Sequence, residues 1–179
     1  MRRITASAGA LLALLMLAEA DEPRAVAAAE IEAPVAEVWD AFTTTAGLRR
    51  WWAPLVEIEL AVGGAIRSSF DPGGGLGDEG TIVHTILAFD PGRMIALQPT
   101  GYPDAFPFAA AMRATWTVFY LEELAPERTR ITIVALGYSD GGDSQKLRAF
   151  FEPANAELMR RLAAALQRTG ERAAGGGAG

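Results

Sequence analysis

Residues 31–54, IEAPVAEVWDAFTTTAGLRRWWAP, carry the clearest structural signal in this chain of 179 residues. A short β-type run passes through Ala-Pro into a helical segment, which ends at a Trp-Trp-Ala-Pro turn. Pro34 suits the first position of a helix, because the N–H group that it lacks would have no helical partner there. Helical spacing gives the segment one apolar face, formed by Val35, Val38, Trp39 and Phe42. The stretch therefore predicts a strand followed directly by an amphipathic helix.

The middle of the chain alternates apolar and polar residues with a period of two, which is typical of strands with one buried face. Turn signals separate these runs, among them Gly63-Gly64 and the sequence Asp-Pro-Gly-Arg at 90–93. Residues 99–108 contain three prolines, so this segment is expected to be irregular. Seven strands are predicted, over residues 24–31, 56–60, 66–70, 81–89, 94–98, 113–124 and 130–138.

Helical spacing returns near the C-terminus. Residues 144–168 form one apolar stripe of Leu147, Phe151, Leu158, Leu162 and Leu166. A second short helix is expected over residues 46–52. Pro153 interrupts the long helix and permits two interpretations: it begins a helix near Glu152 after a separate helical piece, or it kinks a continuous helix.

Residues 31–54 resemble the opening of the SRPBCC (START-like, polyketide-cyclase-like) superfamily, and most closely its branch related to the activator of Hsp90 ATPase. The resemblance implies an α+β helix-grip fold. In this fold a curved seven-stranded antiparallel sheet wraps around a long C-terminal helix, two short helices follow the first strand, and a cavity lies between sheet and helix. The resemblance covers residues 24–168. Relatives often carry a Gly-Trp pair early in the last helix, where this chain has Phe-Phe-Glu-Pro at 150–153.

The first twenty residues resemble a secretory signal peptide. Arg2 and Arg3 precede an apolar run over residues 8–17 that is too short to span a bilayer. Ala18 and Ala20 are small residues at the positions that a signal peptidase reads. A buried N-terminal helix is the alternative, but residues 8–17 offer no polar face. We therefore expect cleavage near Ala20, a periplasmic or secreted mature protein without stable membrane insertion, and a flexible Gly/Ala-rich tail over residues 169–179.

Composition excludes several classes of function. The full chain has a formal net charge of −6, and removal of residues 1–20 leaves 14 basic and 21 acidic residues. A net charge of −7 argues against binding to nucleic acid or to anionic membranes. The chain has no cysteine, which excludes disulfides, thiolate nucleophiles and zinc–thiolate sites. No cofactor and no metal site are expected.

Two motif matches are better explained by local structure. Residues 75–80 read Gly-x-Gly-x-x-Gly, yet they precede a strand rather than a helix and contain two acids that would repel phosphate. Residues 137–141 match the nucleophile-elbow pattern Gly-x-Ser-x-Gly. His84 is the chain's sole histidine and comes before this serine, whereas the hydrolase order places it after. We interpret the two segments as a hairpin loop and a strand-to-helix turn.

Aromatic and polar residues near the expected cavity are candidates for ligand binding. His84 lies between Ile82 and Ile86 on one strand face, where a packed histidine and a ligand contact are both plausible. Either face of the strand containing Trp116 is compatible with an inward position. Asn155 is one turn beyond Phe151 on the last helix, so the two share a face. The candidate ligand-binding residues are Trp51, Phe70, His84, Trp116, Phe151 and Asn155, and no catalytic residue is assigned.

Three functions are compatible with these features. The first is a non-catalytic carrier or sensor that binds a small hydrophobic or amphipathic molecule in the cavity. The second is a cavity enzyme, such as a cyclase, dehydratase or hydrolase, in which His84 acts as acid or base with an acid such as Asp104. The third is a protein-interaction module that uses residues 99–108 as an apolar patch. Because no catalytic set is evident, the carrier is preferred.

Overall fold

The computed structural model describes residues 25–175, so the expected signal peptide and its cleavage point lie outside the described part of the chain. Within residues 25–175, no helix has the length and apolar character needed to cross a membrane.

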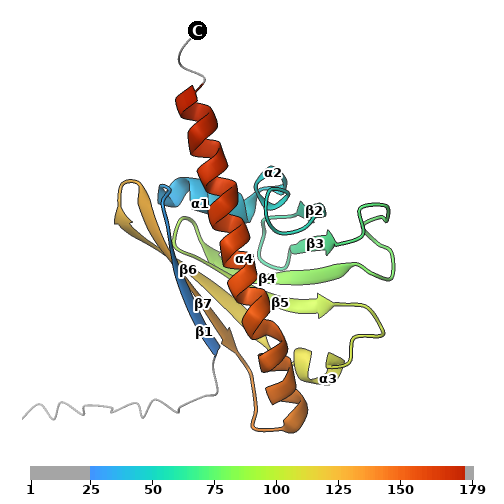
Figure 1. Cartoon of the computed structure of the whole chain (residues 1–179). Helices are drawn as coiled ribbons and strands as arrows, with labels where there is room; N and C mark the ends of the chain where they lie inside the picture. Colours follow the sequence, from blue (N-terminus) through green and yellow to red (C-terminus); the bar gives the residue numbers. More distant parts are fainter. Residues whose placement is uncertain (1–24, 176–179) are drawn as a thin grey trace, which may run out of the picture.

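In the described part of the chain, seven antiparallel strands form a single curved sheet in the order β1-β7-β6-β5-β4-β3-β2 (Figure 1). Most neighbours in the sheet are also neighbours in sequence, so hairpins build it from β2 to β7, and β1 then pairs with β7. The strands are β1 (Ala25–Ile31), β2 (Leu55–Ile58), β3 (Ala65–Ser69), β4 (Ile82–Asp90), β5 (Met94–Gly101), β6 (Trp116–Ala125) and β7 (Arg128–Leu136). The predicted number of strands and their antiparallel arrangement are confirmed.

Helices cover the concave face of the sheet. Two short helices, α1 (Val35–Thr43) and α2 (Thr45–Leu48), follow β1 as predicted. The long helix α4 (Gly142–Gly175) crosses in front of the sheet and lies nearest to β1, α1 and α3 (Figure 1). It runs without a break through Pro153, so the interpretation with two separate helical pieces is wrong. This arrangement confirms the α+β helix-grip fold.

Two elements differ from the sequence prediction, one within the segment expected to be irregular and one directly after it. Strand β5 continues through Pro99 to Gly101, and the short helix α3 (Ala109–Met112) follows. The ladder between β4 and β5 shifts register between Val83 and His84, where Pro99 stands opposite His84. A bulge of this kind lets a strand include a proline, which cannot donate a ladder hydrogen bond.

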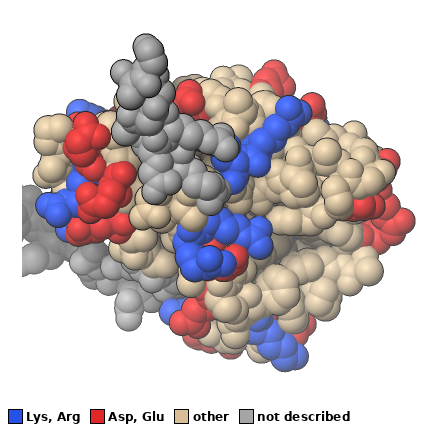
Figure 2. Space-filling view, turned by 45° about the horizontal axis from the view of Figure 1, so that its top comes forward, with Lys and Arg blue, Asp and Glu red and all other residues tan. Residues whose placement is uncertain are grey.

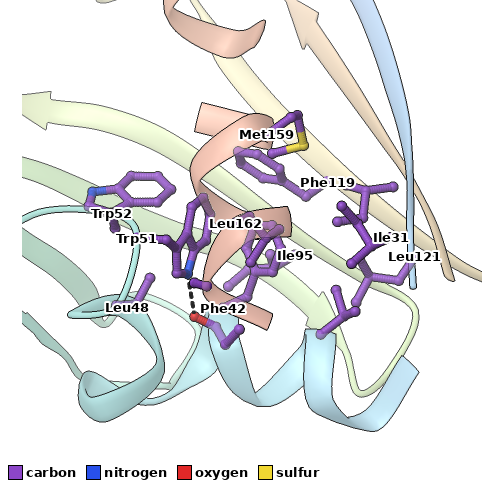
Figure 3. Packing of buried hydrophobic residues seen from close by; sticks show 14 of the residues in the cluster. Ile31, Phe42, Leu48, Trp51, Trp52, Ile95, Phe119, Leu121, Met159 and Leu162 are labelled. Atoms are coloured by element: carbon purple, nitrogen blue, oxygen red, sulfur yellow. Dashed lines mark hydrogen bonds between the residues drawn. The ribbon is translucent and has the colours of Figure 1, made fainter. Parts of the chain in front are cut away.

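The main core lies between α1, α4 and the concave face of the sheet (Figure 3). The Phe42 ring is in contact with Trp51 at a centroid distance of 4.8 Å and with Phe119 at 5.2 Å. The Trp51 Nε1–H group donates a hydrogen bond to the Ala41 carbonyl at 2.9 Å, which ties the Trp-Trp turn to α1. From α4, the residues that pack into this core include Met159 and Leu162.

A second, smaller cluster lies beyond the main core, near α3 and the beginning of α4. Four buried residues form its centre: Met112, Ala135, Tyr138 and Leu147. Several aromatic side chains pack around them, namely Tyr102, Phe106, Phe108 and Phe151. Pro153 therefore separates the part of α4 that belongs to the second cluster from the part that belongs to the main core.

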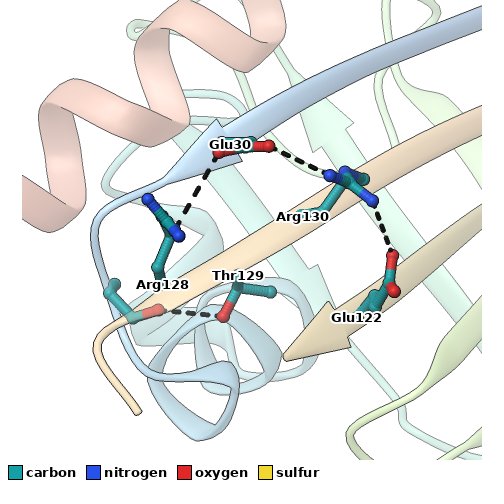
Figure 4. Close-up of polar contacts among 6 residues, drawn as sticks. Glu30, Glu122, Arg128, Thr129 and Arg130 are labelled. Atoms are coloured by element: carbon teal, nitrogen blue, oxygen red, sulfur yellow. Dashed lines mark hydrogen bonds and ion pairs between the residues drawn. The ribbon is translucent and has the colours of Figure 1, made fainter. Parts of the chain in front are cut away.

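Polar contacts on both faces of the sheet fasten β1 and the turn after it to neighbouring strands (Figure 4). Arg130 on β7 pairs with Glu30 on β1 and with Glu122 on β6, both at 3.1 Å. These contacts raise the pKa of Arg130, chiefly through its hydrogen bond to Glu30. The adjacent Thr129 is fully buried, and its hydroxyl donates a hydrogen bond to the Ala33 carbonyl at 2.9 Å.

Candidate functional site

The concave face of the sheet is filled at one end and partly accessible at the other. Ile86, Ile95 and Leu97 are almost completely buried under the helices. Further along the same face four residues retain partial exposure: Ile82, His84, Pro99 and Thr117. The strand pairing places them together, since His84 is opposite Pro99, and Thr117 is opposite Leu97 next to Pro99. We call these four residues the inner strip.

His84 projects from the inner strip towards Trp52. The two rings meet edge to face, with a centroid distance of 5.5 Å and an interplanar angle of 89°. Although the residue keeps some accessible surface, its Nδ1 atom is buried and has no hydrogen-bond partner within the described chain. Burial lowers the pKa of His84 to about 4, because the surrounding side chains cannot solvate an imidazolium. The ring is therefore neutral at physiological pH.

Ser68 provides a second polar atom on the same face. Its side chain is 1% exposed, and its Oγ atom also lacks a hydrogen-bond partner among residues 25–175. In the ladder between β3 and β4, Ile66 is opposite His84 and Ser68 is opposite Ile82. Ser68 and His84 are therefore diagonal neighbours, a relationship in which Cα atoms are roughly 7–8 Å apart.

The structure distributes the other predicted ligand-binding residues over several environments. Trp51 is buried in the main core, and Phe70 is 55% exposed just after β3. Trp116 is opposite Leu136 and adjacent to Thr117, so strand alternation places it on the outer face of the sheet. Phe151 belongs to the second cluster, and Asn155 is half-buried one turn further along α4. Of the six candidates, His84 is the one that lies on the inner strip.

Ser68 and Trp52 are not among the residues predicted for the site. For Ser68 a signal was present, because the period of two along β3 places it on the same face as Ile66, which is buried. The position of Trp52 depends on how the turn after α2 folds back against β4. This contact joins residues 32 positions apart, and no local pattern predicts it.

The Trp-Trp turn also borders a surface hollow of about 310 Å³ on the side of the molecule near α2 and α4. Its walls are Arg49, Arg50, Trp51, Trp52, Ala53, Pro54, Arg160, Arg161 and Ala164. Arg160 and Arg161 both bind Glu157, and their hydrogen bonds lower the pKa of that carboxyl, Arg161 contributing most. Figure 2 accordingly shows basic and acidic side chains intermingled on this face rather than one uniform basic patch.

The two motif-like segments have structural roles. In the loop between β3 and β4, Asp71 accepts a hydrogen bond from the Gly73 N–H group at 2.9 Å and Asp78 accepts one from Gly75 at 2.6 Å. The Ser139 N–H group donates to the Ser144 hydroxyl at 2.9 Å at the beginning of α4. These contacts confirm a hairpin loop and a strand-to-helix turn. Within residues 25–175, no three His, Asp or Glu side chains come together as metal ligands.

Comparisons with known proteins agree with this fold. The profile of the family described as "Activator of Hsp90 ATPase homolog 1-like protein" matches residues 32–167. Among curated proteins no similar sequence is found. The solution structure of the Aha1 dimer from Colwellia psychrerythraea is similar, with a TM-score of 0.64, 21% identity, and coverage of 80% of this chain and 96% of that one.

Two crystal structures are similar to the same extent. Protein MLL2253 from Mesorhizobium loti has a TM-score of 0.65 and 20% identity over 82% of this chain and 98% of that one. Protein NE0264 from Nitrosomonas europaea has a TM-score of 0.62 and 18% identity over 83% and 96%. At these identities the structures show a shared fold. Since the family profile spans most of the chain, this protein belongs to the activator of Hsp90 ATPase homolog 1-like family of the SRPBCC superfamily.

Proposed function

We propose that this protein binds a small hydrophobic or amphipathic molecule between the sheet and α4, and acts as a non-catalytic carrier or sensor. The observation that carries the proposal is the inner strip, where apolar side chains remain partly accessible next to residues of the same face that are almost completely buried. Apolar surface with a few polar atoms is the usual lining of a small-molecule site.

The charge distribution supports an uncharged ligand. The inner-face residues around the strip are apolar or neutral: Ile66, Ser68, Ile82, His84, Ile86, Leu97, Pro99 and Thr117. An ionised ligand placed there would lose its hydration without gaining an opposite charge. The same side chains offer a neutral molecule both apolar contact and hydrogen-bonding atoms.

The state of His84 favours binding over catalysis. A general base works best when its pKa is near the working pH. Burial lowers the pKa of His84 to about 4, so the ring is a weak proton acceptor. Asp104, the acid paired with it in the enzyme hypothesis, is exposed in the segment between β5 and α3.

We also infer that the protein is exported. The apolar run over residues 8–17, behind Arg2 and Arg3, supports this inference, as do the small residues before Asp21. An exported member of the family would have a ligand or partner outside the cytoplasm and would not meet Hsp90 there.

Native mass spectrometry of gently purified protein, followed by organic extraction, tests the carrier. A discrete added mass that is lost when the protein unfolds is the expected result, and the extract identifies the chemical class. Incubation of the extracted compound with the protein then separates carrier from enzyme, because a carrier returns the compound unchanged. Conversion of the compound to a product would contradict the non-catalytic role.

A further inference from the structure

Two buried polar atoms on the concave face have no hydrogen-bond partner: the Ser68 Oγ atom and the His84 Nδ1 atom. Among the residues that the structure describes, no other buried side-chain nitrogen or oxygen is in this condition. Buried polar groups are nearly always hydrogen-bonded in folded proteins, and an exception calls for an explanation. Here the two exceptions are diagonal neighbours on adjacent strands of one face.

We propose that Ser68 and His84 together bind the hydroxyl group of an otherwise apolar ligand, an inference that rests on the proposed carrier function. The two residues act as a polar anchor at the inner strip. The remainder of the ligand packs against apolar side chains beside them, such as Ile82 and Pro99, which retain accessible surface.

The chemistry of the two atoms selects a hydroxyl over other groups. A serine hydroxyl donates one hydrogen bond and accepts others, whereas Nδ1 of a neutral imidazole either accepts or donates according to its tautomer. A ligand hydroxyl can donate to one of these atoms and accept from the other in either tautomer. A carboxylate would bring a charge to a face without cations, and a hydrocarbon would leave both atoms unpaired.

The Trp52 ring gives the anchor a fixed geometry. Trp52 is 7% exposed and its edge-to-face contact with His84 restricts the orientation of the imidazole. Ser68 is held by the ladder between β2, β3 and β4, where Val56 and Ile82 are its direct partners. Both groups therefore belong to rigid elements, which is a requirement for discrimination between ligands that differ by one hydroxyl.

A matched pair of probes tests the anchor. Naphthalene and 2-naphthol differ by one hydroxyl group, and 2-naphthol is neutral at pH 7. Equilibrium dialysis of each probe against the wild-type protein should give tighter binding of 2-naphthol by about tenfold, which corresponds to one satisfied hydrogen bond. The Ser68→Ala variant should lose most of this preference while it retains the affinity for naphthalene.

Ser69→Ala is the matched control. Ser69 is equally well buried, but it is adjacent to Ser68 in β3 and so lies on the opposite face, and its hydroxyl accepts a hydrogen bond from the Asp71 N–H group at 3.3 Å. This variant should keep the preference for 2-naphthol. The His84→Phe variant preserves a ring beside Trp52 and should lose the preference as Ser68→Ala does.

The melting temperature distinguishes the anchor from a purely structural serine, because the two roles predict changes of opposite sign in the Ser68→Ala variant. Without a probe, Ser68→Ala should melt at a higher temperature than the wild type, since an unpaired buried hydroxyl is removed. Ser69→Ala should melt at a lower temperature, since it loses a hydrogen bond. A lower melting temperature for Ser68→Ala, with affinity lost for both probes, would show that Ser68 is structural and would overturn the anchor.

The two proposals fail in different ways. If the wild type binds both probes equally and Ser68→Ala changes neither affinity, the anchor is overturned while apolar binding on the concave face stands. If the wild type binds neither probe, the proposed carrier function is contradicted, and the anchor with it.

Discussion

His84 illustrates how the surroundings of one side chain determine its chemistry. Its direct neighbours on the concave face, Ile66, Ile82, Ile86 and Pro99, are apolar, and the Trp52 ring covers part of the imidazole. The folded protein therefore disfavours the charged form, which lowers the pKa from 6.5 to about 4. In the unfolded chain the imidazole is solvated and its pKa is not lowered. The free energy of unfolding must therefore depend on pH.

We expect the free energy of unfolding to decrease as the pH falls from about 6.5 to about 4. In that window the unfolded chain binds a proton at His84 and the folded protein does not, which favours the unfolded state. The loss from this residue should be about 2–3 kcal/mol between neutral pH and about pH 4.5. Urea unfolding of the wild type and His84→Gln at both pH values measures it, because the variant retains the contribution of the carboxylates.

Proton NMR offers an independent check of the same pKa. Since the chain has one histidine, its ring resonance is unambiguous. The resonance should titrate with a midpoint near 4 in the folded protein. A midpoint near 6.5 would contradict the burial of the ring.

Gly137 is required by backbone geometry at the end of β7. Its φ angle of +82° is in the left-handed region, and a Cβ atom there would overlap the Ala114 carbonyl oxygen. Gly92 has a similar φ of +73°, but a Cβ atom there would meet no other atom, so this residue is the matched control. We expect Gly137→Ala to cost about 3 kcal/mol or more and Gly92→Ala about 1 kcal/mol, as measured by urea unfolding. Equal costs would show that the structure relaxes around Ala114.

The positions of single residues were predictable where strand alternation determines them, and not where they depend on contacts between distant parts of the chain. The inward position of His84 follows from the period of two, and the same rule would have found Ser68. The buried position of Trp51 and the contact of Trp52 with His84 depend on how residues 49–54 fold back, which no local pattern encodes. Local alternation is compatible with either face for Trp116, and the strand pairing places it on the outer face.

Helix α4 contributes residues to both hydrophobic clusters, and Pro153 lies between the two sets of residues. A proline inside a helix removes one backbone hydrogen bond and crowds the preceding turn, here leaving the Ala149 carbonyl without its helical donor. Leu147 and Phe151 precede the proline in the second cluster, while Met159 and Leu162 follow it in the main core.

Pro153→Ala should raise the free energy of unfolding by about 1–3 kcal/mol, because alanine restores the missing hydrogen bond and relieves the crowded turn. Chemical unfolding measures the change. Glu152→Ala alters an exposed neighbouring position without affecting the backbone, so its effect should be small. A decrease in stability for Pro153→Ala would show that the proline ring makes packing contacts that outweigh the backbone cost.

The fastening of β1 depends more on one buried hydrogen bond than on the surface ion pairs. Thr129→Val should cost about 1–2 kcal/mol, since the Ala33 carbonyl loses its donor in a buried position. Arg130→Met removes the pairs with Glu30 and Glu122, which are exposed and therefore screened by salt. In high salt the loss of unfolding free energy should become smaller for Arg130→Met and stay the same for Thr129→Val. A larger loss for Arg130→Met than for Thr129→Val would contradict this ranking.

Strand and helix boundaries were predictable where apolar residues recur at a regular spacing along the whole element. The strands predicted from alternation differ from the observed ones by a few residues at their ends, and α4 follows from its leucine stripe. The segment after Gln98 was not predictable, because a bulge accommodates Pro99 in β5 and tertiary packing stabilises the four-residue α3. Isolated helices of that length are not stable, so their sequences carry little signal.

For the whole molecule, the order of elements and the resemblance of residues 31–54 were sufficient to predict the helix-grip fold. The same information did not locate the site, because the accessible part of the concave face depends on how closely α4 approaches each strand. The helix lies nearest to β1, α3 and α1, and the inner strip lies on β4, β5 and β6.

Export predicts a shortened protein. In a bacterial host that processes secretory signals, the intact mass should correspond to a chain that begins at Asp21. Ala20→Arg places a large charged residue at the cleavage position and should leave the precursor uncleaved. Ala29→Arg, within β1, is the control and should leave cleavage after Ala20 intact. Recovery of the full-length mass from the wild type in the cytoplasmic fraction would contradict export.

Because Pro153 divides the hydrophobic residues of α4 between two clusters, we expect the two clusters to open at different rates. Proteins open in cooperative units of unequal stability, and a small cluster bounded by a defective helical turn is expected to open before the main core. The second cluster includes the Phe106 ring, which contacts Phe150 across the beginning of α4. Amide hydrogen exchange should then be faster over residues 142–152 than over the part of α4 that packs in the main core, and the residence time of the proposed ligand would follow this local opening rather than global unfolding.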